Sequence, residues 1–320
     1  MATYIALFDT TSPQVNLARE EYLLKNKKDD YILLWKNEPS VIIGKNQNTY
    51  AEVNLKKAEE LNVHVVRRIT GGGAVYHDLG NLNYTFITDG YNPDTDFKTF
   101  SLPVCEYLKS IGLNATFSGR NDILIDGMKI SGTAVAVENN RTMYHGTLMF
   151  DVNLSVLGEI LIPSPLKLQS RGISSVKSRV TNIKEHTSLS PDEFINGLFN
   201  YLKQSHEIYI PTTKDTDAVI ALANSKYSSW DWNVGQNPKY SVSNSKKFDF
   251  GIVSLDFDVY NGVIDKLSLT GDFFGLHDVS QLCSRLCGIA HTKESLITAL
   301  CDVNQFISGA TPLDIAEMFF

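Results

Sequence analysis

The chain has 320 residues, of which 43% are hydrophobic and 20% are charged, a composition typical of a globular protein with one large core or two domains. The net charge of -7 and the pI of about 5.5 argue against a dedicated nucleic-acid binder, which usually has a basic balance. No run approaches the roughly 18 apolar residues of a membrane span, and the N-terminal stretch MATYIALFDT lacks the features of a signal peptide. The four cysteines match no CxxC spacing, so we expect reduced thiols and a cytoplasmic protein.

Apolar runs and helix signals alternate through the N-terminal part of the chain. The runs at residues 4–8, 31–35, 41–43 and 63–69 predict strands. Helices are predicted at Pro13 to Asn26, with proline in the first turn, at residues 51–61 and at Phe97 to Ile111. Because the hairpins described below exclude a purely parallel arrangement, we predict an α+β fold in which helices pack on a mixed sheet.

Residues 67–87, RRITGGGAVYHDLGNLNYTFI, place three glycines after two arginines and before an alternating apolar run. Glycines let successive backbone N–H groups approach an anion, and Arg67 or Arg68 could add bidentate donors to a phosphate. A Walker A loop is excluded because no GK pair follows, and a dinucleotide fingerprint is excluded because Tyr76 stands where its third glycine would be. The pattern predicts a strand, loop and strand that bind phosphate, although a glycine-rich hairpin or bulge has the same spacing.

Residues 118–137 contain Asp126-Gly127 between two alternating apolar segments, which predicts a two-residue hairpin turn. A regular hairpin pairs Ile125 with Met128, Leu124 with Lys129, Ile123 with Ile130 and Asp122 with Ser131. Alternation then places Asp122, Leu124, Lys129 and Ser131 on one face, and the isoleucines and Met128 on the core face. Asp122 and Lys129 become diagonal neighbours about 7 to 8 Å apart, with room for a phosphate and Mg²⁺ between them. An exposed face with a solvated lysine and aspartate is the alternative.

Residues 166–183, LKLQSRGISSVKSRVTNI, carry four basic side chains among serines and glycine in an acidic chain. They are Lys167, Arg171, Lys177 and Arg179. A loop of this kind can close over a nucleotide, or it can be a solvated linker. His145 lies in the segment YHGTLMF, where we expect the entry of another apolar strand and a hydrogen-bonded core histidine rather than a catalyst.

The C-terminal part is predicted to be a separate small domain. Residues Asn233 to Lys247 are rich in serine and asparagine and predict a linker. Two strands, Phe248 to Tyr260 and Val263 to Thr270, are expected to flank an Asn261-Gly262 turn, and helices are expected at residues 276–288 and 292–307. We therefore expect domains at residues 1–240 and 246–320.

Together the segments RRITGGGAVYHDLGN, GRNDILIDGMKISGTA with HGTLMF behind it, and KLQSRGISSVKSRVTNI resemble the successive motifs of the lipoate-protein ligase A family. The likeness spans about residues 5 to 240 and includes SSWDWNVGQNPKYS at 228–241. The resemblance implies the α+β fold of class II aminoacyl-tRNA synthetases and biotin ligases, with a small α/β accessory domain at the C-terminus. It also implies a ligase that uses ATP and Mg²⁺ to convert lipoate to lipoyl-adenylate with release of pyrophosphate. The lipoyl group then passes to a lysine of an acceptor protein.

The resemblance also assigns partners and site residues. The implied acceptors are E2 subunits of 2-oxoacid dehydrogenases and the glycine cleavage H protein, and neither nucleic acid nor a membrane is an expected partner. Lys129 is the implied catalytic residue, in contact with both ATP and the lipoyl carboxyl. Asn121 and Asp122 match the site near the metal, with Asp122 as its ligand, and residues 167–182 match the adenylate-binding loop. Thr70 stands where related sequences often have serine, a change that keeps the hydroxyl. The implied ATP-binding residues are Arg68, Gly73, Ala74, Val75, Tyr76, Lys129 and Arg179, and the implied lipoate-binding residues are Gly72, His77 and Lys129.

Three alternatives stay open. An ATP-independent octanoyl or lipoyl transferase would use a cysteine nucleophile, whereas Cys105 lies in a predicted helix, where packing is expected. A biotin ligase shares the fold class but matches the motifs less well. A non-catalytic module that binds a nucleotide or an acyl carrier is the third alternative, and the presence of Arg68, Asp122 and Lys129 together argues against it.

Overall fold

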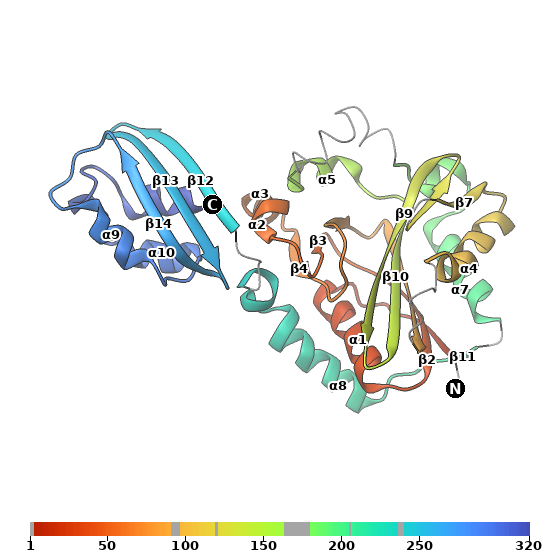
Figure 1. Cartoon of the computed structure of the whole chain (residues 1–320). Coiled ribbons are helices and arrows are strands. Elements are labelled where there is room, and N and C mark those ends of the chain that lie inside the picture. Colours follow the sequence, from red (N-terminus) through yellow and green to blue (C-terminus); the bar gives the residue numbers. More distant parts are fainter. Residues whose placement is uncertain (1–2, 91–96, 119–120, 163–179, 205, 236–239) are drawn as a thin grey trace. The chain divides into compact units, whose positions relative to one another are not determined.

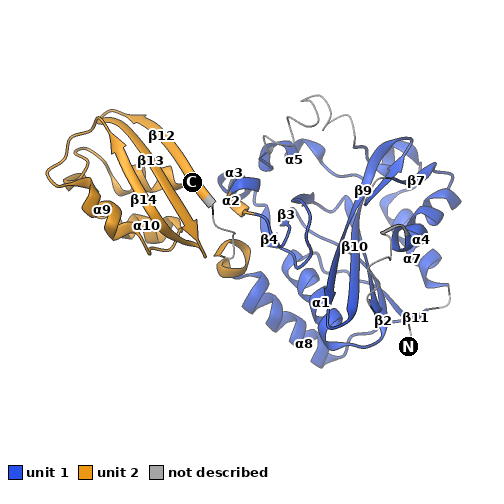
Figure 2. Cartoon of the chain, in the orientation of Figure 1, with its two compact units in different colours: residues 1–47, 51–229 blue, residues 48–50, 230–320 orange. Residues whose placement is uncertain are grey.

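The computed structural model describes residues 3–90, 97–118, 121–162, 180–204, 206–235 and 240–320 (Figure 1). The chain divides into two compact units, shown in different colours in Figure 2. Unit 1 comprises Met1–Gln47 and Ala51–Ser229, and unit 2 comprises Asn48–Tyr50 and Trp230–Phe320. Each unit has its own hydrophobic core, as expected of a structural domain.

Unit 1 is built on a large mixed sheet. Its strands are β1 (Thr3–Leu7), β2 (Asp30–Lys36), β6 (Asn81–Asp89), β7 (Ala115–Ser118), β8 (Asp122–Ile125), β9 (Met128–Glu138), β10 (Arg141–Met149) and β11 (Glu207–Ile208). Their order is β11-β1-β2-β6-β10-β9-β8-β7. β1 is parallel to β11 and β2, and the other neighbours are antiparallel. The mixed sheet predicted from the sequence is therefore confirmed.

Helices cover both faces of this sheet (Figure 1). α1 (Pro13–Asn26) lies on one face, and α4 (Phe97–Ser110) and α7 (Pro191–Lys203) lie on the other. α8 (Thr213–Leu222) packs on α1, and α5 (Leu154–Ile160) packs with the small sheet described below. Short helical turns lie at Ile183–His186 and Ala223–Tyr227. α4 and α7 pack on the face where Leu34 and Tyr84 are buried. Trp35 and Thr85, one position along their strands, point to the opposite face, where Thr85 bonds to Glu20 of α1. α1 and the strands beneath it are thus joined by polar as well as apolar contacts.

A small sheet carries the glycine loop. It contains β3 (Ser40–Ile43), β4 (His64–Arg67) and β5 (Val75–His77) in the order β4-β3-β5. The loop joins β4 to β5, and these strands do not pair with each other, because β3 lies between them. The predicted order of strand, loop and strand is confirmed, and the alternative of a glycine-rich hairpin is wrong.

The single helix predicted at residues 51–61 is wrong. The structure has two short helices, α2 (Thr49–Glu52) and α3 (Leu55–Glu60). Val53 between them forms a β-bridge with Leu161. The Asn54 side chain then caps α3 by accepting a hydrogen bond from the Lys57 N–H at 3.0 Å. A long-range bridge and a local cap therefore interrupt a helix that local propensity favours.

The predicted hairpin turn forms, with positive φ at Asp126 (50°) and Gly127 (82°). The register is as predicted for Ile125–Met128 and Leu124–Lys129, but a bulge shifts the next two pairs to Ile123–Ser131 and Asp122–Gly132. Ser131 is fully buried and Met128 is partly exposed, so the predicted facing of these two residues is wrong. The bulge lets two consecutive residues, Ile130 and Ser131, lie in the interior.

Unit 2 contains an antiparallel sheet covered by helices. Its strands are β12 (Tyr240–Phe248), β13 (Gly251–Tyr260) and β14 (Val263–Gly271), and its helices are α9 (Val279–Leu286), α10 (Lys293–Ala299) and α11 (Pro312–Ala316), with short helical turns at Asp231–Gly235, Val303–Gln305 and Glu317–Phe319. The predicted pair of strands around Asn261-Gly262 is confirmed. The linker predicted up to Lys247 is wrong, because its second half pairs with β13 as strand β12. The helix predicted at 292–307 ends early, at Ala299.

Tyr50 is held within unit 2 by aromatic and polar contacts. Its ring centroid lies 4.6 Å from that of His291 and 5.7 Å from that of Phe320. The Tyr50 hydroxyl donates to the His291 carbonyl oxygen at 2.9 Å.

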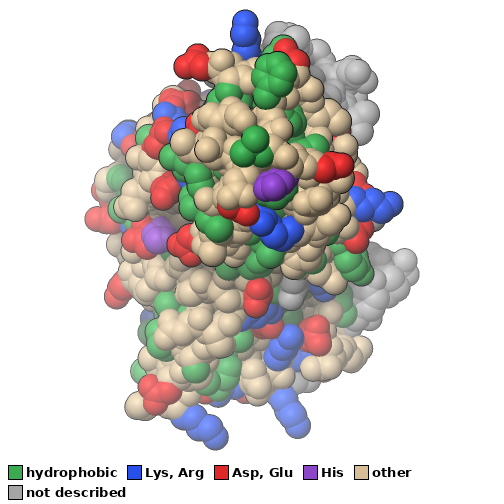
Figure 3. Space-filling model, turned by 90° about the vertical axis from the view of Figure 1, so that its left-hand side faces the viewer, with side chains coloured by type: hydrophobic (Ala, Val, Ile, Leu, Met, Phe, Trp, Pro, Cys, Tyr) green, Lys and Arg blue, Asp and Glu red, His purple; other side chains and the backbone are tan. Residues whose placement is uncertain are grey.

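Figure 3 shows one face of the molecule, on which acidic and basic side chains are interspersed among hydrophobic ones. In the described part of the chain, every helix is too short or too polar to cross a bilayer.

Candidate active site

Unit 1 contains a cavity of about 510 Å³ beside the glycine loop. Its lining comes from α1, β2, β3, the glycine loop, β5, β6, the β8–β9 hairpin and β10, so residues far apart in the sequence meet there. The apolar lining includes Leu17, Trp35, Ile42, Met149, Leu157 and Leu161, and the polar lining includes Asn81, Asn83, Thr133 and Thr147. A largely apolar cavity with a few convergent polar groups is typical of a small-molecule site.

The cavity brings together the sequence-predicted site residues that the structure describes. They are Arg68, Gly72, Gly73, Ala74, Val75, Tyr76, His77, Asn121, Asp122 and Lys129. The remaining prediction, Arg179, lies outside the described residues, as do Lys167, Arg171 and Lys177 of the same basic loop. Val180, the first described residue after that loop, lines the cavity and bridges to Lys129. Residues from Arg68 to Val180, which are far apart in the sequence, thus share one site.

Arg68 holds the glycine loop from behind. Its guanidinium donates to Thr70 Oγ1 at 2.8 Å, and to the carbonyl oxygens of Ile42 at 2.9 Å, Gly71 at 2.6 Å and Gly73 at 2.9 Å. Four of its five N–H groups are therefore used within the protein. Burial lowers the pKa of the guanidinium to about 10, which leaves it charged at neutral pH. Arg68 organises the loop, and its contact with ATP stays a prediction.

Arg67 is fully buried and holds a neighbouring loop instead of facing the cavity. Its Nη1 donates to the carbonyl oxygens of Gly44, Lys45 and Gln47 at 3.0, 3.1 and 2.6 Å. The suggestion that Arg67 donates to a phosphate is therefore wrong. The loop that it holds packs tightly on the glycine loop, since a Cβ at Gly44 would lie 2.1 Å from the Gly72 carbonyl oxygen.

Lys129 and Asp122 form an ion pair at 2.7 Å. The bulge contributes to this contact because it pairs Asp122 with Gly132. Gly132 has no side chain, and a Cβ there would lie 3.1 Å from Lys129 Nζ, so the end of the lysine can lie over this position. The gap expected for a phosphate and Mg²⁺ is thus closed by direct contact. The side chains are 34% and 22% exposed, so solvent screens the pair and a ligand can separate it at modest cost.

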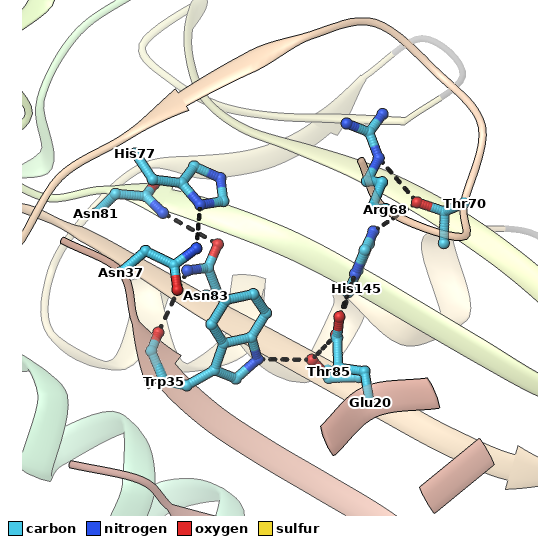
Figure 4. A network of polar contacts seen from close by, with 10 residues as sticks. All are labelled: Glu20, Trp35, Asn37, Arg68, Thr70, His77, Asn81, Asn83, Thr85 and His145. Carbon is cyan, nitrogen blue, oxygen red and sulfur yellow. Dashed lines mark hydrogen bonds and ion pairs between the residues drawn. The ribbon is translucent and has the colours of Figure 1, made fainter. Parts of the chain in front are cut away.

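The hydrogen bonds around His77 determine its tautomer (Figure 4). Asn16 Nδ2 donates to Asn37 Oδ1 at 3.0 Å, which turns Asn37 Nδ2 towards His77 Nδ1 at 3.1 Å. Nδ1 therefore accepts, and Nε2 carries the proton of the neutral ring. Burial, with Arg68 and His145 nearby, lowers the pKa of His77 to about 3. Nε2 is buried and has no hydrogen-bond partner among the described residues, and His77 lies in the wall of the cavity.

His145 lines the cavity and Glu20 supports it from behind, although the sequence did not indicate this. His145 lies in the middle of β10, not at its entry as predicted, and its two ring nitrogens contact Thr70 Oγ1 at 2.8 Å and Glu20 Oε1 at 3.0 Å. The prediction of a hydrogen-bonded core histidine is confirmed, but the ring also lines the cavity. Glu20 sits in a helix with mixed faces, NLAREEYLL, and nothing local shows that its carboxylate is buried.

No cysteine is among the described residues that line the cavity. Cys105 is 2% exposed in α4, outside the cavity lining, and burial raises the pKa of its thiol. The described residues also contain no group of three or more His, Cys, Asp and Glu side chains that could hold a metal. Asp122 is a carboxylate in the lining of the cavity, and Mg²⁺ is commonly held by one or two carboxylates together with substrate phosphates.

Comparisons with known proteins agree with this arrangement. The model of the lipoyl protein ligase A/B catalytic domain matches residues 12–203, and that of the bacterial lipoate protein ligase C-terminus matches residues 237–319. The chain is 42% identical to lipoate--protein ligase 1 of Staphylococcus aureus, over 95% of this chain and 94% of that protein. It is 39% identical to lipoate-protein ligase LplJ of Bacillus subtilis, over 96% of this chain and 97% of that protein.

Solved structures are similar as well. A bi-partite lipoate protein ligase from Thermoplasma acidophilum has a TM-score of 0.67 and 28% identity, covering 76% of this chain and 100% of that chain. A lipoate-protein ligase A bound with ATP has a TM-score of 0.64 and 26% identity, covering 73% and 99%. LipL1 of Plasmodium falciparum in complex with lipoate has a TM-score of 0.63 and 26% identity, covering 99% and 98%.

Proposed function

Since the chain belongs to the lipoyl protein ligase family and is a ligase, we propose that its cavity joins lipoate to ATP as lipoyl-adenylate and then passes the lipoyl group to an acceptor lysine. One observation carries the proposal: Lys129, the glycine loop and a set of apolar side chains line a single cavity. The apolar part suits the alkyl chain of the acid, and the cationic and backbone N–H groups suit its carboxylate and the phosphates.

The adenylation step requires two anions to approach each other. The carboxylate oxygen of lipoate attacks the α-phosphorus of ATP, and the bond to pyrophosphate breaks. A cation between them offsets their repulsion and stabilises the charge that develops in the transition state. We assign this role to Lys129, which lines the cavity and would have to separate from Asp122 to meet the ligands. We assign it an electrostatic role rather than a covalent one, because the acyl acceptor is a lysine of another protein.

Gly73, Ala74, Val75 and Tyr76 are assigned to ATP, and Gly72 is assigned to lipoate. His77 is assigned to lipoate as a neutral Nε2–H donor. Asp122 is assigned to Mg²⁺, together with the phosphates. The metal would neutralise phosphate charge. Asp122 would exchange its ion pair with Lys129 for the metal, which would leave Lys129 free to meet the ligands.

The proposal extends to the acceptor and to the domains. We assign catalysis to residues 1–240 and an accessory role to residues 246–320. E2 lipoyl domains and the glycine cleavage H protein are the proposed acceptors, and the structure of the Thermoplasma ligase was determined as part of a system with its E2 lipoyl domain. We also propose that the protein is cytoplasmic, because the spacing of its cysteines predicts reduced thiols.

The proposed adenylation is tested by exchange of labelled pyrophosphate into ATP, with Mg²⁺ and without an acceptor protein. Exchange should occur with lipoate and not with biotin. Lys129→Ala should lower the rate by about two to three orders of magnitude, as removal of a transition-state charge partner does, while the protein stays folded. Lys184→Ala is the matched control, because Lys184 pairs with Asp151 outside the cavity and its loss should leave the rate unchanged.

A purified E2 lipoyl domain then tests the transfer step, which should add one lipoyl group to one lysine, as measured by mass spectrometry. Absence of exchange from folded protein with any acid would reject adenylation. If the acceptor is then modified only when lipoyl-adenylate is supplied, the chain is a transferase alone. A Lys129→Ala protein that exchanges at the rate of the unsubstituted protein would remove this lysine from the mechanism.

A further inference from the structure

A chain of hydrogen bonds runs behind the glycine loop and involves residues that the proposed chemistry does not use (Figure 4). Arg68 Nε donates to Thr70 Oγ1 at 2.8 Å, and Thr70 Oγ1 lies 2.8 Å from His145 Nε2. His145 Nδ1 lies 3.0 Å from Glu20 Oε1. These four residues are all buried, and they come from the loop after β4, from β10 and from α1.

The direction of every bond in this chain is fixed by its two ends. The Glu20 carboxylate can only accept, so His145 Nδ1 donates to it, and Nε2 of the neutral ring is left as an acceptor for the Thr70 hydroxyl, whose oxygen also accepts from Arg68. On the other side, Trp35 Nε1 can only donate, so Thr85 Oγ1 accepts from it at 2.9 Å and donates to Glu20 at 2.6 Å. Both branches end on the carboxylate of Glu20.

Thr70, His145 and Glu20 have the residue types and spacing of a nucleophile, a base and an acid. Thr70 is nevertheless 0% exposed and is absent from the cavity lining, so its hydroxyl cannot reach a substrate. Its oxygen also already accepts a hydrogen bond from Arg68. The chain of bonds therefore acts on Arg68 rather than on a reacting atom.

Arg68 in turn sets the orientation of two peptide groups in the loop. Its Nη2 holds the carbonyl oxygens of Gly71 and Gly73 at 2.6 and 2.9 Å. In a trans peptide the N–H points opposite to the C=O, so the N–H groups of Gly72 and Ala74 are turned away from the guanidinium. Gly72, Gly73 and Ala74 line the cavity, and Gly72 has φ of 95°, which glycine tolerates best.

We propose that Glu20, acting through His145 and Thr70, is a positioning residue that fixes Arg68 and thereby aims the N–H groups of the glycine loop at the phosphates of ATP. This inference rests on the proposed function. It assigns Glu20 and Thr70 a part in ATP affinity although neither contacts the nucleotide. Preorganised donors stabilise an anion only while their orientation is held, so loss of the Thr70 hydroxyl should weaken ATP binding.

The test compares Thr70→Val, which keeps the shape and removes the hydroxyl, with Thr70→Ser, which keeps the hydroxyl. In pyrophosphate exchange, Thr70→Val should raise KM for ATP about tenfold or more, with a smaller change in KM for lipoate, and Thr70→Ser should stay within about twofold of the unsubstituted protein. Thr142→Val removes an equally buried hydroxyl, bonded to the Gly90 carbonyl outside the cavity, and should leave both KM values unchanged.

Amide hydrogen exchange of residues 71–74 gives a readout that needs no catalysis. Thr70→Val should speed exchange there, and Thr70→Ser should not. Glu20→Gln keeps the shape of the carboxylate and should raise KM for ATP several-fold, so a misfolded Thr70→Val protein still leaves a test. Folded Thr70→Val and Glu20→Gln proteins with unchanged KM and unchanged amide exchange would overturn the inference, as would a Thr70→Ser protein that behaves like Thr70→Val. Absence of exchange activity in the unsubstituted protein would instead reject the proposed function.

Discussion

Gly132 keeps a space open for the end of the Lys129 side chain. A Cβ at this position would lie 3.1 Å from Lys129 Nζ and 3.4 Å from its Cε. Gly132→Ala should therefore leave the fold intact, because the flexible end of the lysine can move aside, but it should displace the charge. We expect lipoate-dependent pyrophosphate exchange to fall about tenfold with little change in melting temperature.

The same substitution in a Lys129→Ala background supplies its control. If Gly132→Ala acts by moving the Lys129 ammonium, it should cost nothing further once that ammonium is absent. Additive losses in the double variant would show that Gly132 acts independently of the lysine.

His291 makes the stability of unit 2 depend on pH. Burial lowers the pKa of its ring to about 4, although the bond to the Phe319 carbonyl opposes this. The unfolded value is about 6.5, so from pH 6.5 down to 4 the unfolded chain binds a proton that the folded chain does not, and folding free energy is lost as the pH falls. We expect unit 2 to lose about 2 kcal/mol between about pH 7.5 and pH 5.

His291→Gln tests this prediction, because glutamine can donate to the Phe319 carbonyl and does not titrate. Urea denaturation at the two pH values should show a smaller loss in the variant, by about 2 kcal/mol. Equal losses in both proteins would mean that other groups, such as carboxylates, control the acid sensitivity.

The sequence predicted that several single residues share one site, and it missed others. Lys129 and the residues from Gly72 to His77 line the cavity, as their motifs indicate. Arg67 was misjudged because a cationic side chain beside glycines has the same sequence pattern whether it donates to a phosphate or to backbone carbonyls. Glu20 was missed because its partners, Thr85 and His145, lie 65 and 125 residues away.

Two loops support each other at the scale of secondary-structure elements. The loop after β3 packs on the glycine loop so closely that a Cβ at Gly44 would meet the Gly72 carbonyl oxygen at 2.1 Å. Gly44→Ala should push the glycine loop out of place and lower pyrophosphate exchange by about 100-fold. Gly158→Ala in α5, where a Cβ would meet nothing within 4 Å, should keep full activity. Normal activity in Gly44→Ala would show that the loop tolerates displacement.

Elements with strong local signals were predicted most accurately. α1 spans Pro13–Asn26 as expected, because Ser12 caps it and proline suits the first turn. The Asp126-Gly127 turn is equally local. The bulge after Lys129 and the strand β12 depend on pairing with other strands, and the serines and asparagine of β12 carry little strand propensity of their own. The bulge and β12 were therefore not predicted, because the local sequence pattern does not contain their pairing partners.

At the scale of the whole molecule, each unit should respond separately to damage in its core. Ile264 in unit 2 and Leu198 in unit 1 are both 0% exposed and belong to different hydrophobic clusters. Truncation of a buried aliphatic side chain costs about 2 to 5 kcal/mol. Ile264→Ala should lower the melting temperature of one calorimetric transition by about 10 °C, and Leu198→Ala should lower the other. A single transition that shifts in both variants would show that the units unfold together.

The buried position of Arg68 affects which anions the protein attracts. Its charge lies behind the loop and is used to orient peptide groups, so the glycine loop itself offers a phosphate backbone dipoles, which act only at contact. The net charge of -7 adds a repulsion of polyanions that salt screens over about 8 Å. We therefore expect a site that acts at short range: it should hold a free nucleotide that enters the cavity, and the glycine loop should draw few anions from a distance.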